Sequence, residues 1–469
     1  MKTDTIAAIA TALSDSGIGI IRVSGDEAVE IIDRIYRNKR NEKTLAKYDS
    51  HTIHYGYITE EEGAVIDEVM VSVMKSPRSY TTEDTVEINC HGGILMMRKI
   101  LETVIKAGAR IAEPGEFTKR AFLNGRIDLS RAEAVMDIIH AKNDFALQSS
   151  VKQLKGSVSG KVRNLRDDIL YEIAFIESAL DDPEHISLDG YHERLSEKTD
   201  MLMTELDKLL VSADDGRMLK EGIHTVIVGK PNAGKSSLLN LIVGEDKAIV
   251  TDIAGTTRDT LEEVVSLGGI SLNIIDTAGI RSTEDVVEKI GVERAKKISV
   301  DADLILYVVD SSMPLDENDR DIIQLIQDKN TIILLNKSDL DEIVREEDVI
   351  REINRIRNDK TENVLRVVRT STKFDSGIEE LIHLIKEMFF HGKISYNDEV
   401  YITNMRHKEA IQDAKDSILQ VRKSLDMDMP EDFYSIDLMS AYASLGKIIG
   451  EEVGDDLVNE IFSNFCMGK

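Results

Sequence analysis

The sequence has no tryptophan, two cysteines and six prolines, and aromatic residues make up 5% of its 469 residues. Two cysteines in so long a chain exclude a disulfide framework and are typical of a reducing compartment. No run of about eighteen apolar residues suggests a membrane-spanning helix. The first twenty residues lack a basic start followed by an apolar core, so we expect no secretory signal, no membrane association and a cytoplasmic protein.

Positive charge is also scarce, because 58 Lys and Arg stand against 86 Asp and Glu and leave a net charge of −28. The segments 1–125, 126–221, 222–395 and 396–469 carry −3, −7, −10 and −8. This acidity argues against nucleic-acid binding along a broad basic surface. Any contact with RNA would fall on the nearly neutral N-terminal segment or on a partner protein.

The length predicts two to four domains. β-like runs at 18–25, 51–58, 65–74 and 85–93, with helical patterns near 26–37 and 94–106, predict an α+β domain over 1–120. Apolar residues three and four apart from Val151 to Leu180 predict one long helix that stops at Asp181-Asp182-Pro183. Further helices are expected at 191–214, 405–425 and 436–463, so that 121–221 and 393–469 form one helical domain.

The segment 222–392 reads as an α/β domain inserted in the helical one. Strands expected at 224–229, 271–275, 303–310, 331–335 and near 364–370 alternate with helices at 235–243, 286–299, 316–328 and 377–390. This alternation predicts a mostly parallel sheet with helices on both faces.

A phosphate-binding loop follows the first strand of this insert. Gly229 to Ser236 reads GKPNAGKS, which fits G-x-x-x-x-G-K-[ST] and opens a helix. The glycines let backbone N–H groups surround phosphate oxygens, Lys235 reaches the β and γ phosphates, and the Ser236 hydroxyl can bind Mg²⁺.

Three further elements end later strands in the order of the translation-factor class of P-loop GTPases. Asp276-Thr277-Ala278-Gly279 supplies a carboxylate on the Mg²⁺ side and a glycine near the γ-phosphate. Asn336-Lys337-Ser338-Asp339 places a carboxylate that can accept two N–H bonds from guanine, which adenine cannot offer. Ser371-Thr372-Lys373 stands where Ser-Ala-Lys is usual. The order predicts a GTP site.

The residues expected around GTP come from five segments. They are Asn232, Ala233, Gly234, Lys235, Ser236 and Ser237; Thr251, Asp252, Ile253, Ala254, Gly255, Thr256 and Thr257; Asp276, Thr277, Ala278 and Gly279; Asn336, Lys337 and Asp339; and Ser371, Thr372 and Lys373.

Many small GTPases orient the attacking water with a glutamine directly after the Asp-x-x-Gly motif. Here Ile280 occupies that position and its side chain can neither donate nor accept a hydrogen bond, so another group must orient the water. Thr257, in the Gly- and Thr-rich loop 248–259, is placed to bind Mg²⁺ with Ser236. Glu288 can position the attacking water through a second water, although spacing alone favours a solvated helix carboxylate.

Four segments resemble the MnmE (TrmE) family of tRNA-modification GTPases. They are 245–259, Glu288 to Ala295, Pro114 to Gly125 and the final Phe465-Cys466-Met467-Gly468-Lys469. The resemblance runs from the N-terminus to Lys469 and includes the order of the domains. It implies an N-terminal folate-binding and dimerisation domain, and a helical domain interrupted by a GTPase (G) domain.

The resemblance also implies a K⁺-activated GTPase whose G domains meet face to face in a homodimer. Asn232, Thr251, Ile253 and Thr256 would hold K⁺, which would replace an arginine finger. Without the resemblance, Asn232 reads as a turn-forming residue after Pro231. With it, Glu288 becomes the water-positioning residue and Lys235 the phosphate-binding catalytic lysine.

In this family the N-terminal domain binds a tetrahydrofolate derivative, 5-formyl or methylene, as a one-carbon carrier. The matching positions here are Arg22, Glu87, Arg126 and Lys469. Spacing alone would also allow an edge cation at Arg22 and an exposed strand residue at Glu87. Cys466 lies in the terminal motif and suggests a nucleophile, although burial is the common fate of a free cysteine.

By this resemblance, the chain hydrolyses GTP and, with the flavoprotein MnmG in a heterotetramer or larger complex, adds a carboxymethylaminomethyl or aminomethyl group to C5 of the wobble uridine (position 34) of certain tRNAs. The G domain alone would also fit a regulatory or ribosome-assembly GTPase. A folate-binding protein with a degenerate G domain conflicts with the intact motif residues Lys235, Ser236, Asp276 and Asp339.

Overall fold

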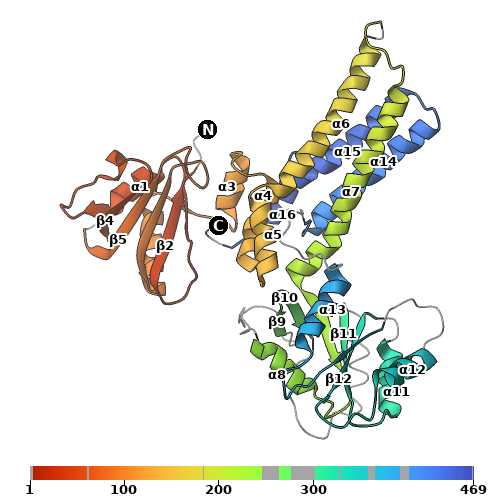
Figure 1. Ribbon diagram of the computed structural model, residues 1–469. Helices are drawn as coiled ribbons and strands as arrows, with labels where there is room; N and C mark the ends of the chain where they lie inside the picture. The colour runs from red at the N-terminus through yellow and green to blue at the C-terminus, as the bar shows by residue number, and fades with distance from the viewer. Residues whose placement is uncertain are drawn as a thin grey trace. The chain divides into compact units, whose positions relative to one another are not determined.

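The computed structural model describes residues 4–60, 63–182, 184–245, 263–275, 302–326, 329–356, 365–390, 401–466 and 468 (Figure 1). The chain divides into two compact units. The first combines Met1–Met136, Gln153–Thr199 and Asp413–Lys469, and the second combines Asp137–Lys152 with Asp200–Gln412. The domain boundaries expected at 120, 221 and 392 stay predictions.

The first unit begins with a seven-stranded sheet in the order β3-β4-β5-β6-β2-β1-β7. Its strands are β1 (Ile6–Ile9), β2 (Ser16–Ser24), β3 (Tyr36–Asn38), β4 (Thr52–Thr59), β5 (Val65–Met74), β6 (Thr85–Gly92) and β7 (Arg110–Ile111). Neighbours are antiparallel, except that β7 runs parallel to β1. This agrees with the α+β pattern expected over 1–120.

One face of this sheet carries the core. Helices α1 (Ala28–Ile35) and α2 (Ile94–Lys106) pack Ile32 and Met97 against Ile21, Val71 and Ile88 of the strands. Because side chains alternate along a strand, Arg22 and Glu87, which pair across β2 and β6, lie on the other face. We call this face, which α1 and α2 leave uncovered, the open face; Arg22 and Glu87 are 16% and 23% exposed there, and Arg22 lies next to the buried Phe117.

A buried ion network fixes helix α3 (Glu116–Leu123) to this sheet region. Arg120 bonds to Glu83 at 3.2 Å, to Glu116 at 3.0 Å and to Asp4 at 2.7 Å. Burial alone would raise the pKa of Glu116, but hydrogen bonds from Arg110, the Glu113 amide and Arg120 outweigh it and hold that pKa below its ordinary value. The network therefore sets where the segment after α3 leaves the sheet.

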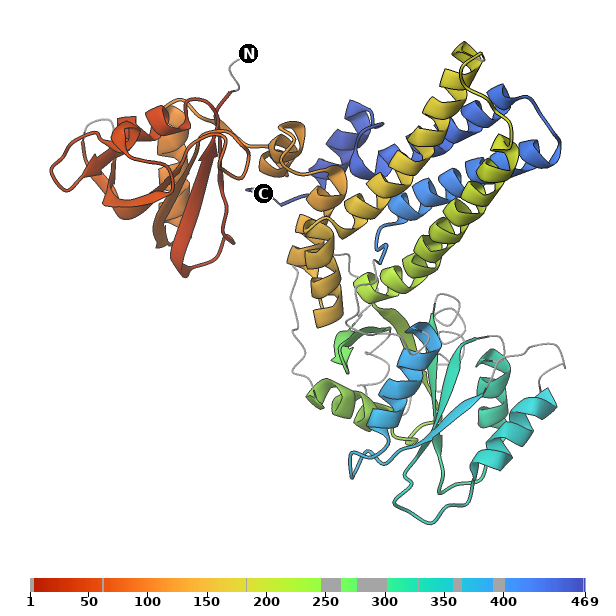
Figure 2. The same cartoon turned by 45° about the horizontal axis from the view of Figure 1, so that its top comes forward.

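The described helices of the segments expected to form the helical domain are α4 (Leu129–His140), α5 (Asp144–Leu154), α6 (Ser157–Asp181), α7 (Tyr191–Glu221), α14 (Met405–Asp426), α15 (Glu431–Ile449) and α16 (Asp455–Ser463). In the first unit α6 packs along α15, as Figures 1 and 2 show. The buried Arg166 of α6 stacks 3.9 Å from the ring centroid of Tyr442 and pairs with Glu451. A cation with two partners is thus kept inside the helix pair.

Two helices that were predicted as continuous are each divided into two in the structure. The stripe from Val151 to Leu180 is split between α5 and α6, because Gly156 adopts φ 99° and a Cβ there would collide with the guanidinium of Arg131. The helix expected over 436–463 likewise ends at Gly450, with φ 87°, before α16 begins. Apolar spacing continued through both breaks and hid them.

The second unit contains a six-stranded sheet in the order β13-β12-β11-β8-β10-β9. Its strands are β8 (Ile223–Val228), β9 (Glu263–Leu267), β10 (Ile270–Ile274), β11 (Leu304–Asp310), β12 (Thr331–Asn336) and β13 (Arg366–Arg369). All described neighbours are parallel except β9 and β10. The predicted α/β class is confirmed, although β9 was not foreseen.

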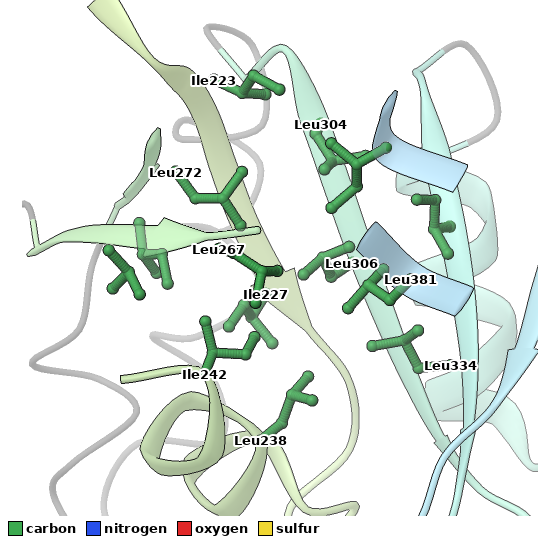
Figure 3. Packing of buried hydrophobic residues seen from close by; sticks show 14 of the residues in the cluster. Ile223, Ile227, Leu238, Ile242, Leu267, Leu272, Leu304, Leu306, Leu334 and Leu381 are labelled. Atoms are coloured by element: carbon green, nitrogen blue, oxygen red, sulfur yellow. The ribbon is translucent and has the colours of Figure 1, made fainter. Parts of the chain in front are cut away.

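Helices cover both faces of this sheet. On one face, Leu238 and Ile242 of α8 (Lys235–Glu245) and Leu381 of α13 (Ile378–Phe390) pack against Ile227 and Leu306 (Figure 3). On the other face lie α11 (Glu317–Ile326) and α12 (Glu346–Ile356). The sequence did not predict α12, and the helix expected over 286–299 lies outside the described residues. In the described part of the chain, no helix is long and apolar enough to cross a membrane.

Replacing Arg120 by Met would leave Glu83 buried without its cation and Glu116 with Arg110 alone. We expect the N-terminal sheet to lose about 3 kcal/mol of stability, because breaking a buried ion pair exposes an uncompensated charge to the interior. Hydrogen exchange of the β2 and β6 amides in the full chain measures the loss. The control Arg98→Met, which removes an exposed cation of α2, should change protection by less than about 0.5 kcal/mol. Equal protection in both variants would contradict the assignment.

Candidate functional site

The phosphate-binding loop joins the end of β8 to the start of α8. Its backbone requires glycine at two places, because a Cβ on Gly229 would collide with the carbonyl of Val308 and a Cβ on Gly234 with the side-chain amide of Asn336. Asn232 adopts φ 62° and is exposed at the turn. The loop and the N-terminus of α8 together form a site suited to anions.

Lys235 lies inside this loop. Its Nζ donates to the carbonyl oxygens of Gly229 and Lys230, at 2.7 Å each. Burial lowers the pKa of Lys235 from its ordinary value. In the described structure the ammonium of Lys235 is therefore held by backbone carbonyls of the same loop. Ser236 and Ser237 follow in the first turn of α8, both exposed.

Asn336, at the end of β12, connects the phosphate loop to the base loop. Its Nδ2 donates to the carbonyl of Ala233 at 2.8 Å, and its Oδ1 accepts from the Thr370 hydroxyl at 3.3 Å. Asn336 is 1% exposed, so both bonds are shielded from water. The asparagine thus holds two loops and the end of β13 together.

Asp339 and Ser371 are brought together as the motifs predicted. The Ser371 hydroxyl donates to Oδ1 of Asp339 at 2.7 Å, and the Ser338 amide donates to the Thr370 carbonyl at 3.1 Å. Thr372 and Lys373 occupy the turn that a bridge between Ser371 and Ser376 closes. One carboxylate oxygen of Asp339 is therefore oriented by Ser371, and the other is left for a ligand.

Lys337 has an anionic partner that the sequence analysis missed. Its Nζ lies 2.5 Å from Oδ2 of Asp310, the last residue of β11, and Ser312 donates to the other oxygen through its amide and its hydroxyl. Burial would raise the pKa of Asp310, but the bonds from Lys337 and Ser312 keep it below its ordinary value. Asp310 therefore stays charged and orients the lysine of the base loop.

Lys230, the second residue of the phosphate loop, is held from the other side. Its Nζ lies 2.7 Å from Asp319 and 3.1 Å from Asp316. Asp319 is 1% exposed and also accepts from the Tyr307 hydroxyl at 2.9 Å. These carboxylates outweigh burial and raise the pKa of Lys230. The loop is thus tied to α11 and β11 through one side chain.

Several predicted site residues lie outside the described residues. They are Thr251, Asp252, Ile253, Ala254, Gly255, Thr256 and Thr257, then Asp276, Thr277, Ala278 and Gly279, and finally Glu288 and Lys469. The strand before Asp276, β10, is described and runs parallel to β8. In the described part of the chain, no three His, Cys, Asp or Glu side chains gather as a metal site.

A second group of predicted residues meets on the open face of the N-terminal sheet. Arg22 Nε donates to Glu87 at 2.8 Å, and its Nη1 donates to the carbonyl of Gly468 at 2.9 Å. Arg126 lies 4.5 Å and Arg22 5.5 Å from the ring centroid of Tyr80. The structure thus brings three of the four predicted folate residues to one place, beside the C-terminal segment.

Sequence reasoning missed Tyr80, Phe117 and the Gly468 carbonyl at this place. Phe117 of α3 lies 5.7 Å from the Arg22 guanidinium. Its only sequence signal was its position within the run Pro114 to Gly125, which carried the family resemblance. Cys466 is exposed, and its carbonyl accepts from the Gly115 amide at 3.4 Å. Cys90 is buried, and burial raises its pKa to about 11, which keeps it a thiol.

Comparisons with known proteins cover the whole chain. A family model described as the GTP-binding protein TrmE N-terminus matches residues 5–126, and one described as the MnmE helical domain matches 129–466. A tRNA modification GTPase MnmE from Lachnoclostridium phytofermentans is 59% identical over 472 residues, with 100% of both chains covered. The chain belongs to the MnmE family of tRNA modification GTPases.

Other members of the MnmE family match this sequence over nearly its full length. The protein of that name from Acetivibrio thermocellus is 48% identical, with 100% of both chains covered. The one from Bacillus pumilus is 47% identical over 99% of this chain and 100% of its own.

A solved structure of the G domain of the T. maritima FeoB iron transporter covers 35% of this chain at 26% identity, with a TM-score of 0.26.

Membership in the MnmE family makes this chain a GTP-hydrolysing enzyme of tRNA modification. The resemblance inferred from four short segments is confirmed, and so is the multidomain fold class. The roles assigned to single residues stay predictions.

Removing the Lys230 ammonium should loosen the phosphate loop. We expect Lys230→Met to lower kcat/KM for GTP about tenfold, because a charge-assisted bond to a buried carboxylate contributes roughly 1.5–3 kcal/mol and part of it orders the loop. Lys230→Arg should retain most of the rate, since it restores the cation beside Asp319. Arg351→Met, which removes a 74% exposed cation of α12, is the control. The idea fails if Lys230→Met and the control behave alike in steady-state kinetics.

Proposed function

We propose that this chain hydrolyses GTP in a K⁺-dependent cycle and, with a flavoprotein partner of the MnmG type, adds an aminomethyl or carboxymethylaminomethyl group to C5 of the wobble uridine (position 34) of certain tRNAs. A tetrahydrofolate derivative would supply the one-carbon unit. The observation that carries this proposal is the pairing of two sites in one chain. One unit has converging nucleotide loops, and the other gathers Arg22, Glu87 and Arg126 around Tyr80.

Guanine recognition is proposed for Asp339. Its carboxylate would accept from the ring N–H and the exocyclic amine of guanine. The Ser371 hydroxyl, which donates to Oδ1 of Asp339 at 2.7 Å, supports this role because it fixes the plane of the carboxylate. Lys337 would lie along the base while Asp310 holds its ammonium.

Phosphate and magnesium binding are proposed for the other end of the site. The loop amides and Lys235 would bind the phosphates, and the Ser236 hydroxyl, with Thr257, would hold Mg²⁺. An exposed hydroxyl oxygen in the first turn of α8 fits this ion, which is typically bound by few protein oxygens and by substrate phosphates. Bound there, Mg²⁺ would neutralise charge on the β and γ phosphates.

The monovalent cation is proposed for Asn232, with Thr251, Ile253 and Thr256. Asn232 is exposed at the turn of the phosphate loop with φ 62°, and its amide oxygen is the kind of ligand that replaces water around K⁺. A cation there would supply the charge of an arginine finger. Glu288 would position water, since Ile280 cannot, and two G domains would meet across this side in a homodimer.

Folate binding is proposed for the open face of the N-terminal sheet. Glu87 gives one oxygen to Arg22, and its remaining lone pairs are suited to the paired donors of a pterin ring. Arg126, whose guanidinium stacks over Tyr80, and Lys469 are suited to the carboxylates of a glutamate tail. Cys466 is exposed on the segment that ends at this face, and its role as a nucleophile stays a prediction.

GTP turnover should depend on K⁺. We expect the full chain with Mg²⁺ to hydrolyse GTP about tenfold faster in KCl than in NaCl, because losing one transition-state charge partner typically costs at least that factor. Asn232→Ala should lower the KCl rate toward the NaCl rate, whereas Asn318→Ala, an exposed asparagine of α11, should leave the ratio unchanged. Equal rates in both salts would remove the cation from the proposal.

The nucleoside found at the wobble position of tRNA tests the proposed reaction. A strain that lacks the gene should lose the modification at position 34 and regain it with the wild-type gene, as nucleoside analysis by mass spectrometry would show. Arg22→Met and Glu87→Gln should not restore it, because they remove the proposed folate contacts, whereas Arg126→Lys should restore most of it since a cation remains.

The same variants separate chemistry from nucleotide turnover. Arg22→Met should keep its GTPase rate within about twofold, because Arg22 belongs to a different unit from the nucleotide loops. If the deletion strain keeps its nucleoside profile, the chain is a regulatory GTPase instead.

A further inference from the structure

Basic residues are concentrated in one short segment of an otherwise acidic chain. Residues 34–47 hold six of the 58 Lys and Arg and a single carboxylate, Glu42, whereas the whole chain carries −28. The segment includes β3, the outermost strand of the N-terminal sheet, and the loop that leads from it to β4. Such a contrast sets this edge apart from the rest of the surface.

The fold orders this loop instead of leaving it as a solvated tail. Oδ1 of Asn38 accepts from the amides of Arg40 and Glu42, at 2.8 and 2.9 Å, and its Nδ2 donates to the Glu42 carboxylate. The buried Leu45 anchors the 3₁₀ helix Leu45–Lys47, and its amide donates to Asp33. The carboxylates of Glu42 and Asp33 therefore accept hydrogen bonds from neutral groups of the loop, the Asn38 amide and the Leu45 backbone.

Four cations of the segment are exposed and a fifth lies beside it. Lys39, Arg40, Lys43 and Lys47 are exposed, and the half-buried Lys75 donates from its Nζ to the carbonyl of Ala46 at 3.4 Å. We call these five residues the basic edge. Among the described residues, no ion pair engages any of the five, and Asp49 is the remaining carboxylate of the loop. Their charge is therefore available to a polyanion.

Aromatic rings lie beside the basic edge. The Lys39 ammonium sits 4.5 Å from the ring centroid of Tyr55, which is 44% exposed and whose hydroxyl bonds to Glu68. Tyr48 and His54 stack with their ring centroids 3.4 Å apart. Cations interleaved with partly exposed aromatic faces are typical of surfaces that bind the backbone and the unpaired bases of RNA.

We propose that the basic edge is a contact surface for tRNA phosphates. This inference rests on the proposed function, since it assigns to that reaction a place where its RNA substrate touches this chain. The G and helical segments carry most of the negative charge and would repel phosphates, so a local cationic surface is the place where a tRNA can approach. RNA is favoured over an acidic protein because the rings offer stacking as well as charge.

The experiment compares two charge-matched variants of the full chain. Lys43→Gln/Lys47→Gln neutralises two cations of the basic edge, and Arg98→Gln/Lys106→Gln neutralises two exposed cations of α2 in the same sheet region. Fluorescence anisotropy with a labelled tRNA transcript between 50 and 200 mM KCl gives the affinity and its salt slope.

We expect the basic-edge variant to lose about tenfold in tRNA affinity, and its salt slope to fall by roughly 1.5, because each lost phosphate contact removes about 0.7–0.9. The α2 variant should match the wild type. Equal loss in both variants, or no loss in either, would overturn the proposal. Lys39→Gln/Arg40→Gln is a second variant of the basic edge and should lose affinity in the same way. Thermal unfolding of every variant shows whether the protein still folds, so that misfolding can be excluded as the cause.

Two further readouts separate this proposal from the proposed function. Wild-type tRNA affinity in the basic-edge variant, together with normal restoration of the wobble nucleoside by the wild-type gene, would overturn the surface and leave the function standing. If the variant binds tRNA normally but loses the flavoprotein in a pull-down, the edge is a protein interface and the proposal is wrong. GTP turnover without tRNA should stay within about twofold of the wild type, because the edge lies in the other unit from the nucleotide loops.

Discussion

One buried amide, the side chain of Asn336, sets the distance between the two ends of the nucleotide site. It donates to Ala233 in the phosphate loop and accepts from Thr370 near the base loop, with 1% of its surface exposed. An unpaired amide in that position would cost about 1–3 kcal/mol, which favours the arrangement in which both loops are in place. Gly234 is required for the same reason, since any side chain there would displace the amide.

β11 supplies the second set of restraints on the nucleotide loops. Tyr307 and Asp310 of this central strand reach the phosphate loop through Asp319 and Lys230, and the base loop through Lys337. Both connections end in an ion pair that is largely shielded from solvent, where removing one partner costs more than the pair contributes. A rigid sheet thus positions two loops whose backbones both enter left-handed conformations, at Asn232 and Lys337.

The sequence predicted the parts of the site that depend on local motifs and missed those that depend on packing. Gly229 to Ser236 and Asn336 to Asp339 could be placed because their spacing follows from the shape of a nucleotide at the ends of parallel strands. The Lys230–Asp319 and Lys337–Asp310 pairs join residues far apart in sequence, and no pattern marks them. Gly156 shows the opposite failure, since an unbroken apolar period concealed the interruption between α5 and α6, where Gly156 has a positive φ and lies too close to Arg131 for a side chain.

The acidity of the chain gives these local cations their specificity. A protein that carries −28 repels polyanions over most of its surface, so GTP, and tRNA if the proposed contact holds, must find their cations in a few defined places. Lys235 is desolvated and donates to two backbone carbonyls of its loop, and the basic edge is ordered by the Asn38 side chain. By these proposals, the buried Lys235 would bind a phosphate at short range, whereas the four exposed cations and the half-buried Lys75 of the basic edge would attract an RNA from a distance. The two sites therefore differ in physics as well as in ligand, and salt should weaken the second far more than the first.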